Sequence, residues 1–260
     1  MSRFTRLFGP KPILAGVYPT GKNPVDRMVG EVMMLSGLGV SGVYLENIHR
    51  TQDDIRNMGM ALEELYRYTH KSDLPYLNNI KIGVNILPDH KGTEYKKAFQ
   101  FARMYSLNFV ALDAIAGKYK IGDDEIELDV DGYLKERKFH SNTFVLGGIF
   151  PPYAQSIGTR DMEYYLEMAT DRSDAVMVKT QRGEQEIPLE RIAEYAGKKH
   201  GIVIGASKIS SKNLRKYFPV VDGFVIGSSL RDGPDGQLNI SFVEETVGIR
   251  NEAIAKLNDY

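Results

Sequence analysis

The chain contains no cysteine among its 260 residues, which excludes disulfide bonds, thiolate nucleophiles and cysteine-ligated zinc. Its net charge is only −1 at neutral pH, and no long block of one sign is present. A protein without a strong positive field is not expected to recruit nucleic acid or an anionic lipid surface. Residues 1–10 lack the apolar core of a signal peptide, and no run approaches the roughly 20 apolar residues of a membrane span. We therefore expect a cytoplasmic protein that does not insert into membranes.

Metal-binding patterns are also absent from the sequence. The five histidines show neither an H-x-x-x-H nor an H-E-x-x-H spacing. The acidic segment 125–132 resembles a calcium loop, but Lys138 stands where such a loop needs a bidentate glutamate. We therefore expect neither a resident metal nor a cofactor.

What the sequence does contain is a regular alternation of short apolar runs with longer helical patterns. The apolar runs predict eight buried parallel strands, at residues 13–18, 42–45, 80–86, 109–112, 143–148, 175–179, 201–205 and 221–227. The helical patterns cover residues 24–38, 51–70, 93–104, 159–170, 188–199 and 210–218. The length and the apolar fraction of 42% suit one (β/α)8 barrel, and no linker interrupts the alternation. We expect an α/β protein made of a single TIM-barrel domain over residues 1–260.

One segment breaks this alternation between the fourth and fifth predicted strands. Residues 125–130 alternate acidic and apolar side chains, and the turn pair Asp131-Gly132 follows them. This pattern predicts a small hairpin or flap within about residues 117–137, in a loop over the barrel mouth.

Polar residues follow several of the predicted strands, at the carboxyl ends where barrel active sites lie. The predicted catalytic residues are Glu46, Asn85, Asp113 and Lys179, with Asn47 and Asp89 in support. Each residue taken alone is as typical of a helix cap or a loop contact as of chemistry. The prediction therefore depends on their convergence at one rim of the barrel.

The last two predicted strands each end in small residues. These residues are Gly205, Ala206 and Ser207 after the seventh strand, and Gly227, Ser228 and Ser229 after the eighth. Such loops leave backbone N–H groups free, and the loops after strands seven and eight of a TIM barrel often hold a phosphate. Tight packing alone would also explain the two glycines. We favour a site for a small phosphorylated ligand.

Lys179 has two interpretations. Residues 178–183 look like the lysine-bearing sixth strand of deoxyribose-phosphate aldolases, and a desolvated amine can form a Schiff base with a carbonyl carbon. Alternatively, Lys179 pairs with Asp113 or Glu46 and helps to hold an anionic substrate. We favour the ion pair.

Four blocks of sequence, spread over nearly the whole chain, resemble the BtpA family. They are G-V-Y-L-E-N at 42–47, G-V-N-I-L-P-D at 83–89, G-A-S-K-I-S-S-K-N at 205–213 and V-D-G-F-V-I-G-S-S-L at 221–230. The resemblance implies a single TIM barrel similar to phosphate-binding barrels such as phosphoribosylanthranilate isomerase. The family takes its name from a factor needed for photosystem I accumulation, other members sit among sugar-metabolism proteins, and no reaction is securely attached to it.

The chain departs from the family pattern after two strands. After the fifth strand the family usually carries an acid, a lysine and a histidine, whereas residues 146–153 read L-G-G-I-F-P-P-Y. After the sixth strand Lys179-Thr180 replaces a Thr-Gly pair, and Ala206-Ser207 stands where Ser-Gly is usual. The departures indicate a different substrate or a lost activity. If chemistry is retained, we expect Lys179 to supply the charge of the missing lysine and histidine.

Three functions remain open at this point. We favour an enzyme, a lyase, an isomerase or one that cleaves a glycosidic bond, acting on a small phosphorylated sugar or a nucleotide-like compound. The second is a Schiff-base aldolase centred on Lys179. The third is a non-catalytic biogenesis or binding factor. Barrels of this kind commonly pair through their outer helices, so the sequence is compatible with a homo-oligomer but does not define the oligomeric state.

Overall fold

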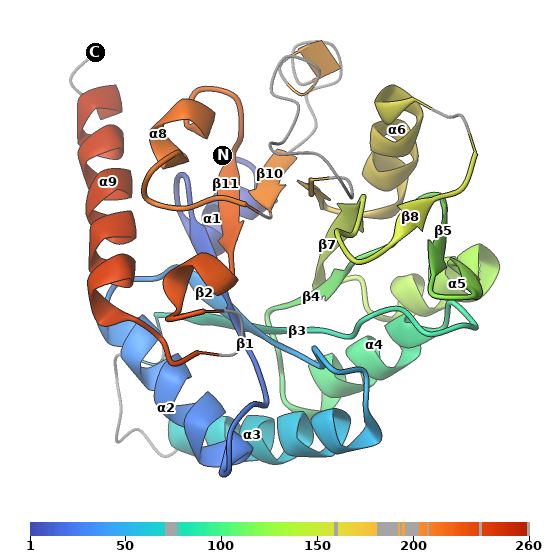
Figure 1. Ribbon diagram of the computed structural model, residues 1–260, viewed down its shortest axis with the longest axis horizontal. Helices are drawn as coiled ribbons and strands as arrows, with labels where there is room; N and C mark the ends of the chain where they lie inside the picture. The colour runs from blue at the N-terminus through green and yellow to red at the C-terminus, as the bar shows by residue number, and fades with distance from the viewer. Residues whose placement is uncertain are drawn as a thin grey trace.

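Eight parallel strands close into a barrel in the order β1-β11-β10-β9-β7-β4-β3-β2, and helices surround it (Figure 1). The computed structural model describes residues 1–70, 77, 79–158, 161–180, 192, 194–195, 203–206, 208–233 and 236–258. The barrel strands are β1 (Ile13–Val17), β2 (Gly42–Glu46), β3 (Lys81–Asn85), β4 (Phe109–Leu112), β7 (Phe144–Ile149), β9 (Ala175–Val178), β10 (Val203–Ala206) and β11 (Gly223–Ile226). Each of them overlaps one predicted apolar run. The TIM-barrel fold expected from the sequence is confirmed.

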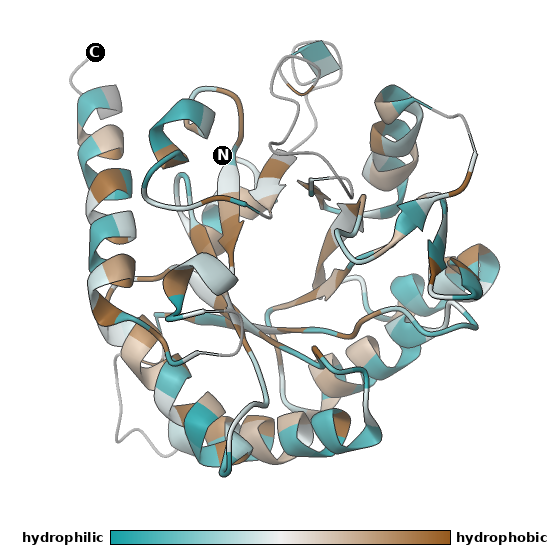
Figure 2. Ribbon diagram, in the orientation of Figure 1, coloured by the Kyte–Doolittle hydropathy of each residue, from teal (hydrophilic) through white to brown (hydrophobic). Residues whose placement is uncertain are grey.

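The longer helices pack on the outside of the barrel. They are α2 (Pro24–Gly37), α3 (Gln52–His70), α4 (Glu94–Met104), α5 (Val130–Phe139), α6 (Met162–Arg172) and α9 (Ile240–Asn258). Hydrophobic and hydrophilic residues alternate along them in Figure 2, as expected for helices with one buried face. None of the helices in the described part of the chain has both the length and the apolar character of a membrane span. Most of the helix predicted at residues 188–199 lies outside the described residues.

The helix predicted over residues 210–218 is wrong in its extent. The observed helix α8 (Leu214–Tyr217) begins four residues later, after Asn213. The side chain of Asn213 accepts a hydrogen bond from the N–H of Ser210 and donates one to the carbonyl of Lys208. These bonds fold residues 208–213 into a turn, so residues 210–213 precede the helix instead of forming its start.

A hairpin projects from the loop after β4. It consists of β5 (Lys118–Ile121) and β6 (Asp124–Glu127), and β8 (Gln155–Ser156) pairs with β5. The predicted turn at Asp131-Gly132 is wrong, because both residues lie in the first turn of α5. The carboxylate of Asp129 accepts a hydrogen bond from the N–H of Gly132 and so caps that helix. The chain turns instead at Gly122, which has a φ of 61°.

The N-terminal end of the barrel is closed by helix α1 (Arg3–Phe8). The rings of Phe4 and Phe8 lie among the inward side chains of the strands, with Phe8 5.3 Å from Phe109 and 5.6 Å from Phe144 between ring centroids. An apolar core therefore fills this end, and polar chemistry is confined to the opposite, C-terminal mouth.

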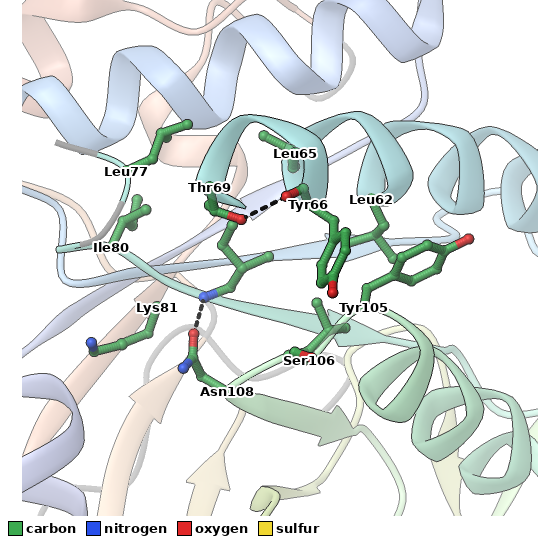
Figure 3. Close-up of a pocket in the computed structure, with 12 residues that line it drawn as sticks. Leu62, Leu65, Tyr66, Thr69, Leu77, Ile80, Lys81, Tyr105, Ser106 and Asn108 are labelled. Atoms are coloured by element: carbon green, nitrogen blue, oxygen red, sulfur yellow. Dashed lines mark hydrogen bonds between the residues drawn. The ribbon is translucent and has the colours of Figure 1, made fainter. Parts of the chain in front are cut away.

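A small cavity of about 170 Å³ lies outside the barrel near the starts of β3 and β4 (Figure 3). Two of its polar side chains already have local partners. Asn108 Oδ1 accepts the N–H of Ile82 at 2.9 Å, and the hydroxyl of Thr69 donates to the carbonyl of Tyr66 at 2.9 Å. This cavity lies at the N-terminal end of the barrel, where TIM-barrel residues contribute to stability rather than to catalysis, so we assign it no chemistry.

Candidate functional site

Strand alternation directs three of the predicted catalytic side chains into the barrel mouth. The inward side chains on β2, β4 and β9 include Tyr44, Ala111 and Met177, which belong to the cluster inside the barrel. Glu46, Asp113 and Lys179 each follow one of them by two residues. Because side chains alternate with a period of two, all three continue the inward rows at the C-terminal ends of their strands.

These side chains form one connected network. Lys179 Nζ lies 2.5 Å from Asp113 Oδ1. Asn85 Nδ2 donates hydrogen bonds to Asp113 Oδ1 at 2.8 Å and to Glu46 Oε2 at 2.7 Å. The hydroxyl of Tyr153, a residue that the sequence analysis missed, donates to Asp113 Oδ2 at 2.9 Å. The structure thus brings together the four residues proposed as catalytic and adds a tyrosine.

The two carboxyl groups of this network have opposite pKa shifts. Burial raises the pKa of Glu46 to about 7, and repulsion from Asp113 acts in the same direction. Burial acts to raise the pKa of Asp113 too, but the ammonium of Lys179 and the hydrogen bonds it receives hold that pKa below its usual value. At neutral pH Asp113 is therefore ionised, while Glu46 exchanges a proton readily. Two carboxyl groups with separated pKa values are typical of acid–base sites.

The network borders a cavity of about 720 Å³ at the C-terminal mouth of the barrel. Glu46, Asp113 and Lys179 line it together with Tyr18, Tyr44 and Tyr153. Its volume lies in the range of small-molecule sites, about 300–1,000 Å³. In the described part of the chain, no group of three or more potential ligand side chains is arranged to hold a metal ion.

The loops after β10 and β11 form another part of the wall. Ala206, Gly227, Ser228 and Ser229 line the cavity, while Gly205 precedes Ala206 on β10 and Ser207 lies outside the described residues. A 3₁₀ turn, η2 (Ser228–Leu230), starts in the second loop, and the first N–H groups of such a turn have no partner within it. The hydroxyl of Ser229 donates to the carbonyl of Ile209, which ties the two loops together. The start of this turn therefore lies in the loop that lines the cavity.

Tyr18 reaches from the end of β1 toward these loops and was also missed by the sequence analysis. A Cβ atom added at Gly16 or Gly227 would clash with its hydroxyl, so both glycines leave the space that the hydroxyl fills. The guanidinium of Arg231 lies 4.7 Å from the centroid of the Tyr18 ring. Burial raises the pKa of Tyr18 far above neutrality, so the hydroxyl remains a hydrogen-bond donor. Leu14 belongs to the cluster inside the barrel, and the period of two along β1 could have pointed to Tyr18, four residues later.

Arg231 is buried and links the loop after β11 to β1 and α2. Its Nη2 lies 2.6 Å from Glu31 Oε2 on α2, and it also donates to the carbonyl of Gly16 at 2.9 Å. The Arg231–Glu31 ion pair thus stabilises the part of the cavity wall against which the Tyr18 ring packs.

The two residues predicted to support the site lie beside the mouth rather than in the network. Asn47 Oδ1 accepts the N–H of Leu87 at 2.7 Å. Asp89 Oδ1 accepts the N–H groups of Lys91 at 2.9 Å and Thr93 at 3.0 Å. Both residues therefore stabilise the loop after β3, which is the structural role that the sequence left open.

The chain matches the model of the BtpA family over residues 22–247. It belongs to the BtpA family. The match covers all eight barrel strands except β1, and it confirms the resemblance seen in the four sequence blocks. A search of curated proteins gives no match.

Solved structures with the same fold are distant in sequence from this BtpA-family protein. The phosphoribosyl anthranilate isomerase from Thermus thermophilus is 9% identical, with a TM-score of 0.59 over 93% of this chain and 99% of that chain. The tryptophan synthase from Mycobacterium tuberculosis is 13% identical, with a TM-score of 0.62 over 95% and 97%. A structure described as native KDPGal is 10% identical, with a TM-score of 0.60 over 94% and 96%. At these identities the likeness establishes the TIM-barrel fold and nothing finer.

Proposed function

We propose that this BtpA-family protein is an enzyme that acts on a small phosphorylated sugar or nucleotide-like metabolite at the C-terminal mouth of its barrel. The observation that carries the proposal is the buried carboxyl of Glu46, whose pKa is raised to about 7 and which Asn85 links to the Asp113–Lys179 ion pair. Titratable groups with perturbed pKa values that gather in a cavity are typical of active sites. The mouth is also where TIM-barrel enzymes carry their chemistry.

Each member of the network has a distinct role in this proposal. Glu46 is the general acid or base, because a carboxyl group with a pKa near neutrality can both give and take a proton. Lys179, which pairs with Asp113, stabilises negative charge that develops on the substrate. Asn85 fixes the separation of the two carboxyl groups by donating to both.

The substrate's phosphate binds on the wall made by the loops after β10 and β11. Ser228 and Ser229 offer backbone N–H groups there, and Lys208 lines the same cavity with a positive charge. The hydroxyl of Tyr18 adds a neutral donor at the edge of this wall. The fold neighbours whose names include a phosphoribosyl group support this placement by analogy alone.

A thermal-shift screen against sugar phosphates, nucleotides and inorganic phosphate tests the proposal. A ligand at 100 times its dissociation constant adds ~2.7 kcal/mol of stability, or about 5–10 °C for a chain of this size. The matched variants are Ser228→Asp, which adds a negative charge beside the phosphate wall, and Ser228→Asn, which adds similar bulk without charge. We expect phosphorylated compounds to stabilise the parent and Ser228→Asn but not Ser228→Asp. If no phosphorylated compound shifts the parent, the proposal is wrong and a non-catalytic role takes its place.

Schiff-base chemistry at Lys179 is the second candidate, because its amine lines the cavity. The 2.5 Å contact with Asp113 argues against it, since the amine is engaged by a carboxylate rather than free to attack a carbonyl carbon. Borohydride reduction in the presence of a carbonyl compound that stabilises the protein, followed by intact mass measurement, separates the two. A trapped adduct that disappears in Lys179→Arg would establish the Schiff base, and no adduct is expected if Lys179 acts only as a charge.

A further inference from the structure

A second cavity of about 500 Å³ opens beside the mouth, and we call it the side cavity. It lies between the loops after β2 and β3, helix α4 and the β5–β6 hairpin. Its apolar lining includes Ile55, Ile86, Leu87, Ile121 and Ile126. A cavity of this size with apolar walls and a few polar groups is typical of a small-molecule site. The network around Glu46 makes no use of it.

Glu94, at the start of α4, lines the side cavity and is only 3% exposed. Its Oε2 is buried and has no hydrogen-bond partner among the described residues. Burial raises the pKa of Glu94 to about 8, so the group is largely uncharged at neutral pH. A protonated carboxyl offers one O–H donor, and leaving a buried polar group unpartnered is unfavourable. Glu94 is thus a buried polar residue of the cavity wall with unused hydrogen-bonding capacity.

The side cavity and the mouth meet at Arg50, Leu87 and Ile121, which line both. Arg50 has a φ of 58°, a left-handed conformation that is costly for a side chain of this kind and is often found at functional sites. Its guanidinium lies 4.4 Å from the centroid of the Tyr153 ring. The two cavities are therefore adjacent, with Arg50 between them.

We propose that the side cavity binds the nucleobase of a nucleotide whose ribose and phosphate lie in the mouth. A nucleobase is flat and largely apolar, which suits the isoleucine-rich walls, and its ring nitrogens and carbonyl oxygens accept hydrogen bonds, which suits the donor on Glu94. The inference rests on the proposed function, because the mouth supplies the phosphate site. It narrows the substrate class from phosphorylated metabolites to nucleotides.

This arrangement has a defined pH dependence. The other charged or titratable groups that line the side cavity are Arg50, Asp89, His90, Lys96, Lys97 and Asp124. Asp89 and Asp113 both raise the pKa of Glu94 by repulsion. A nucleobase that accepts a hydrogen bond from the carboxyl group of Glu94 binds most tightly while that group is protonated. The affinity for the nucleotide therefore falls as pH rises through the pKa of Glu94. A ligand that presented an N–H donor instead would bind tighter as pH rises.

Titration calorimetry with ribose 5-phosphate, CMP, AMP and cytidine tests the inference at pH 7 and pH 9, where cytosine and adenine do not change their protonation. The matched variants are Glu94→Gln, which keeps a hydrogen-bond donor but does not titrate, and Glu94→Leu, which removes the donor. We expect the parent to bind CMP or AMP at least tenfold tighter than ribose 5-phosphate at pH 7, and to lose about tenfold in nucleotide affinity at pH 9. Glu94→Gln should keep the tight binding at both pH values, and Glu94→Leu should bind nucleotides no tighter than ribose 5-phosphate.

The outcomes separate this inference from the proposed function. If ribose 5-phosphate binds but neither nucleotide binds tighter, the side cavity is not a base site, although the phosphate site stands. If cytidine binds in a way that depends on Glu94 while ribose 5-phosphate does not bind, the base site stands and the phosphate site in the mouth fails. Nucleotide affinity that rises with pH in the parent would overturn the role of Glu94 as a donor.

Discussion

The raised pKa of Glu46 makes the stability of the protein depend on pH in a defined direction. Its folded pKa of about 7 lies above the ordinary value of 4.5, so the folded state binds the proton more tightly between these values. The free energy of unfolding therefore falls as pH rises from about 4.5 to 7, and this loss is complete above 7. Glu46→Gln still accepts the hydrogen bond from Asn85 but removes the titration. We expect its melting temperature, relative to the parent, to rise between pH 5 and pH 7.5 and then level off; a constant difference would contradict the shift.

The Lys179–Asp113 pair is the interaction in the site whose two halves depend most on each other. Asp113 is 1% exposed and Lys179 is 9% exposed, so removing one charge leaves the other buried without an ion-pair partner. Breaking a buried pair from one side typically costs about 3–5 kcal/mol. We expect Lys179→Met to lose stability in this range by urea unfolding, and Lys179→Met with Asp113→Asn to recover much of the loss. Simple addition of the two single effects would show that the pair is not coupled.

The residues that the sequence analysis found and those it missed differ in where they lie along the chain. Glu46 and Asp113 directly follow apolar runs, so position alone placed them at the mouth. Tyr18 also ends such a run, but an aromatic residue is typical of a strand, so the sequence analysis assigned it to the strand rather than to the site. Tyr153 and Arg50 lie in loops, and their approach to the site depends on tertiary contacts that no local pattern encodes.

At the scale of elements, the barrel strands were predictable because parallel strands buried on both faces are nearly continuous apolar runs. The hairpin after β4 was harder to predict, because an Asp-Gly pair such as Asp131-Gly132 suits both a β-turn and the first turn of a helix. The structure resolves the choice through Asp129, which caps α5 and leaves the turn to Gly122. Helix α8 was overestimated for a related reason, since the side-chain bonds of Asn213 compete with helix formation.

The packing of this hairpin on the loop after β3 can be tested with two glycines that have nearly the same backbone conformation. Gly92 and Gly122 have φ values of 60° and 61°. A Cβ at Gly92 would clash with the backbone carbonyl of Glu127, whereas a Cβ at Gly122 meets nothing within 4 Å. We expect Gly122→Ala to cost about 1–2 kcal/mol from the left-handed conformation alone, and Gly92→Ala to cost clearly more. Equal costs by urea unfolding would mean that the hairpin moves freely away from the loop.

At the scale of the whole molecule, the barrel separates an apolar end from a polar end. The aromatic cluster around α1 fills one end, while the network of Glu46 and the two cavities lie at or beside the other. This separation lets the mouth carry buried charges that disfavour folding, since the core at the opposite end supplies compensating apolar burial. The sequence predicted the barrel but not this closure, because residues 3–8 form too short a segment to show a helical period.

Phe8 is the residue on which this closure depends most directly, since its ring contacts Phe4, Phe109 and Phe144. Truncating a buried phenylalanine costs about 3–5 kcal/mol through lost apolar burial and the cavity left behind. We expect Phe8→Ala to lose that much by urea unfolding, while Phe139→Ala, at a side chain that is 76% exposed, changes stability by less than about 0.5 kcal/mol. Because Phe8 lies at the end opposite the mouth, ligand affinity measured on the folded variant should stay as in the parent. A loss near that of Phe139→Ala would mean that α1 is not part of the barrel core.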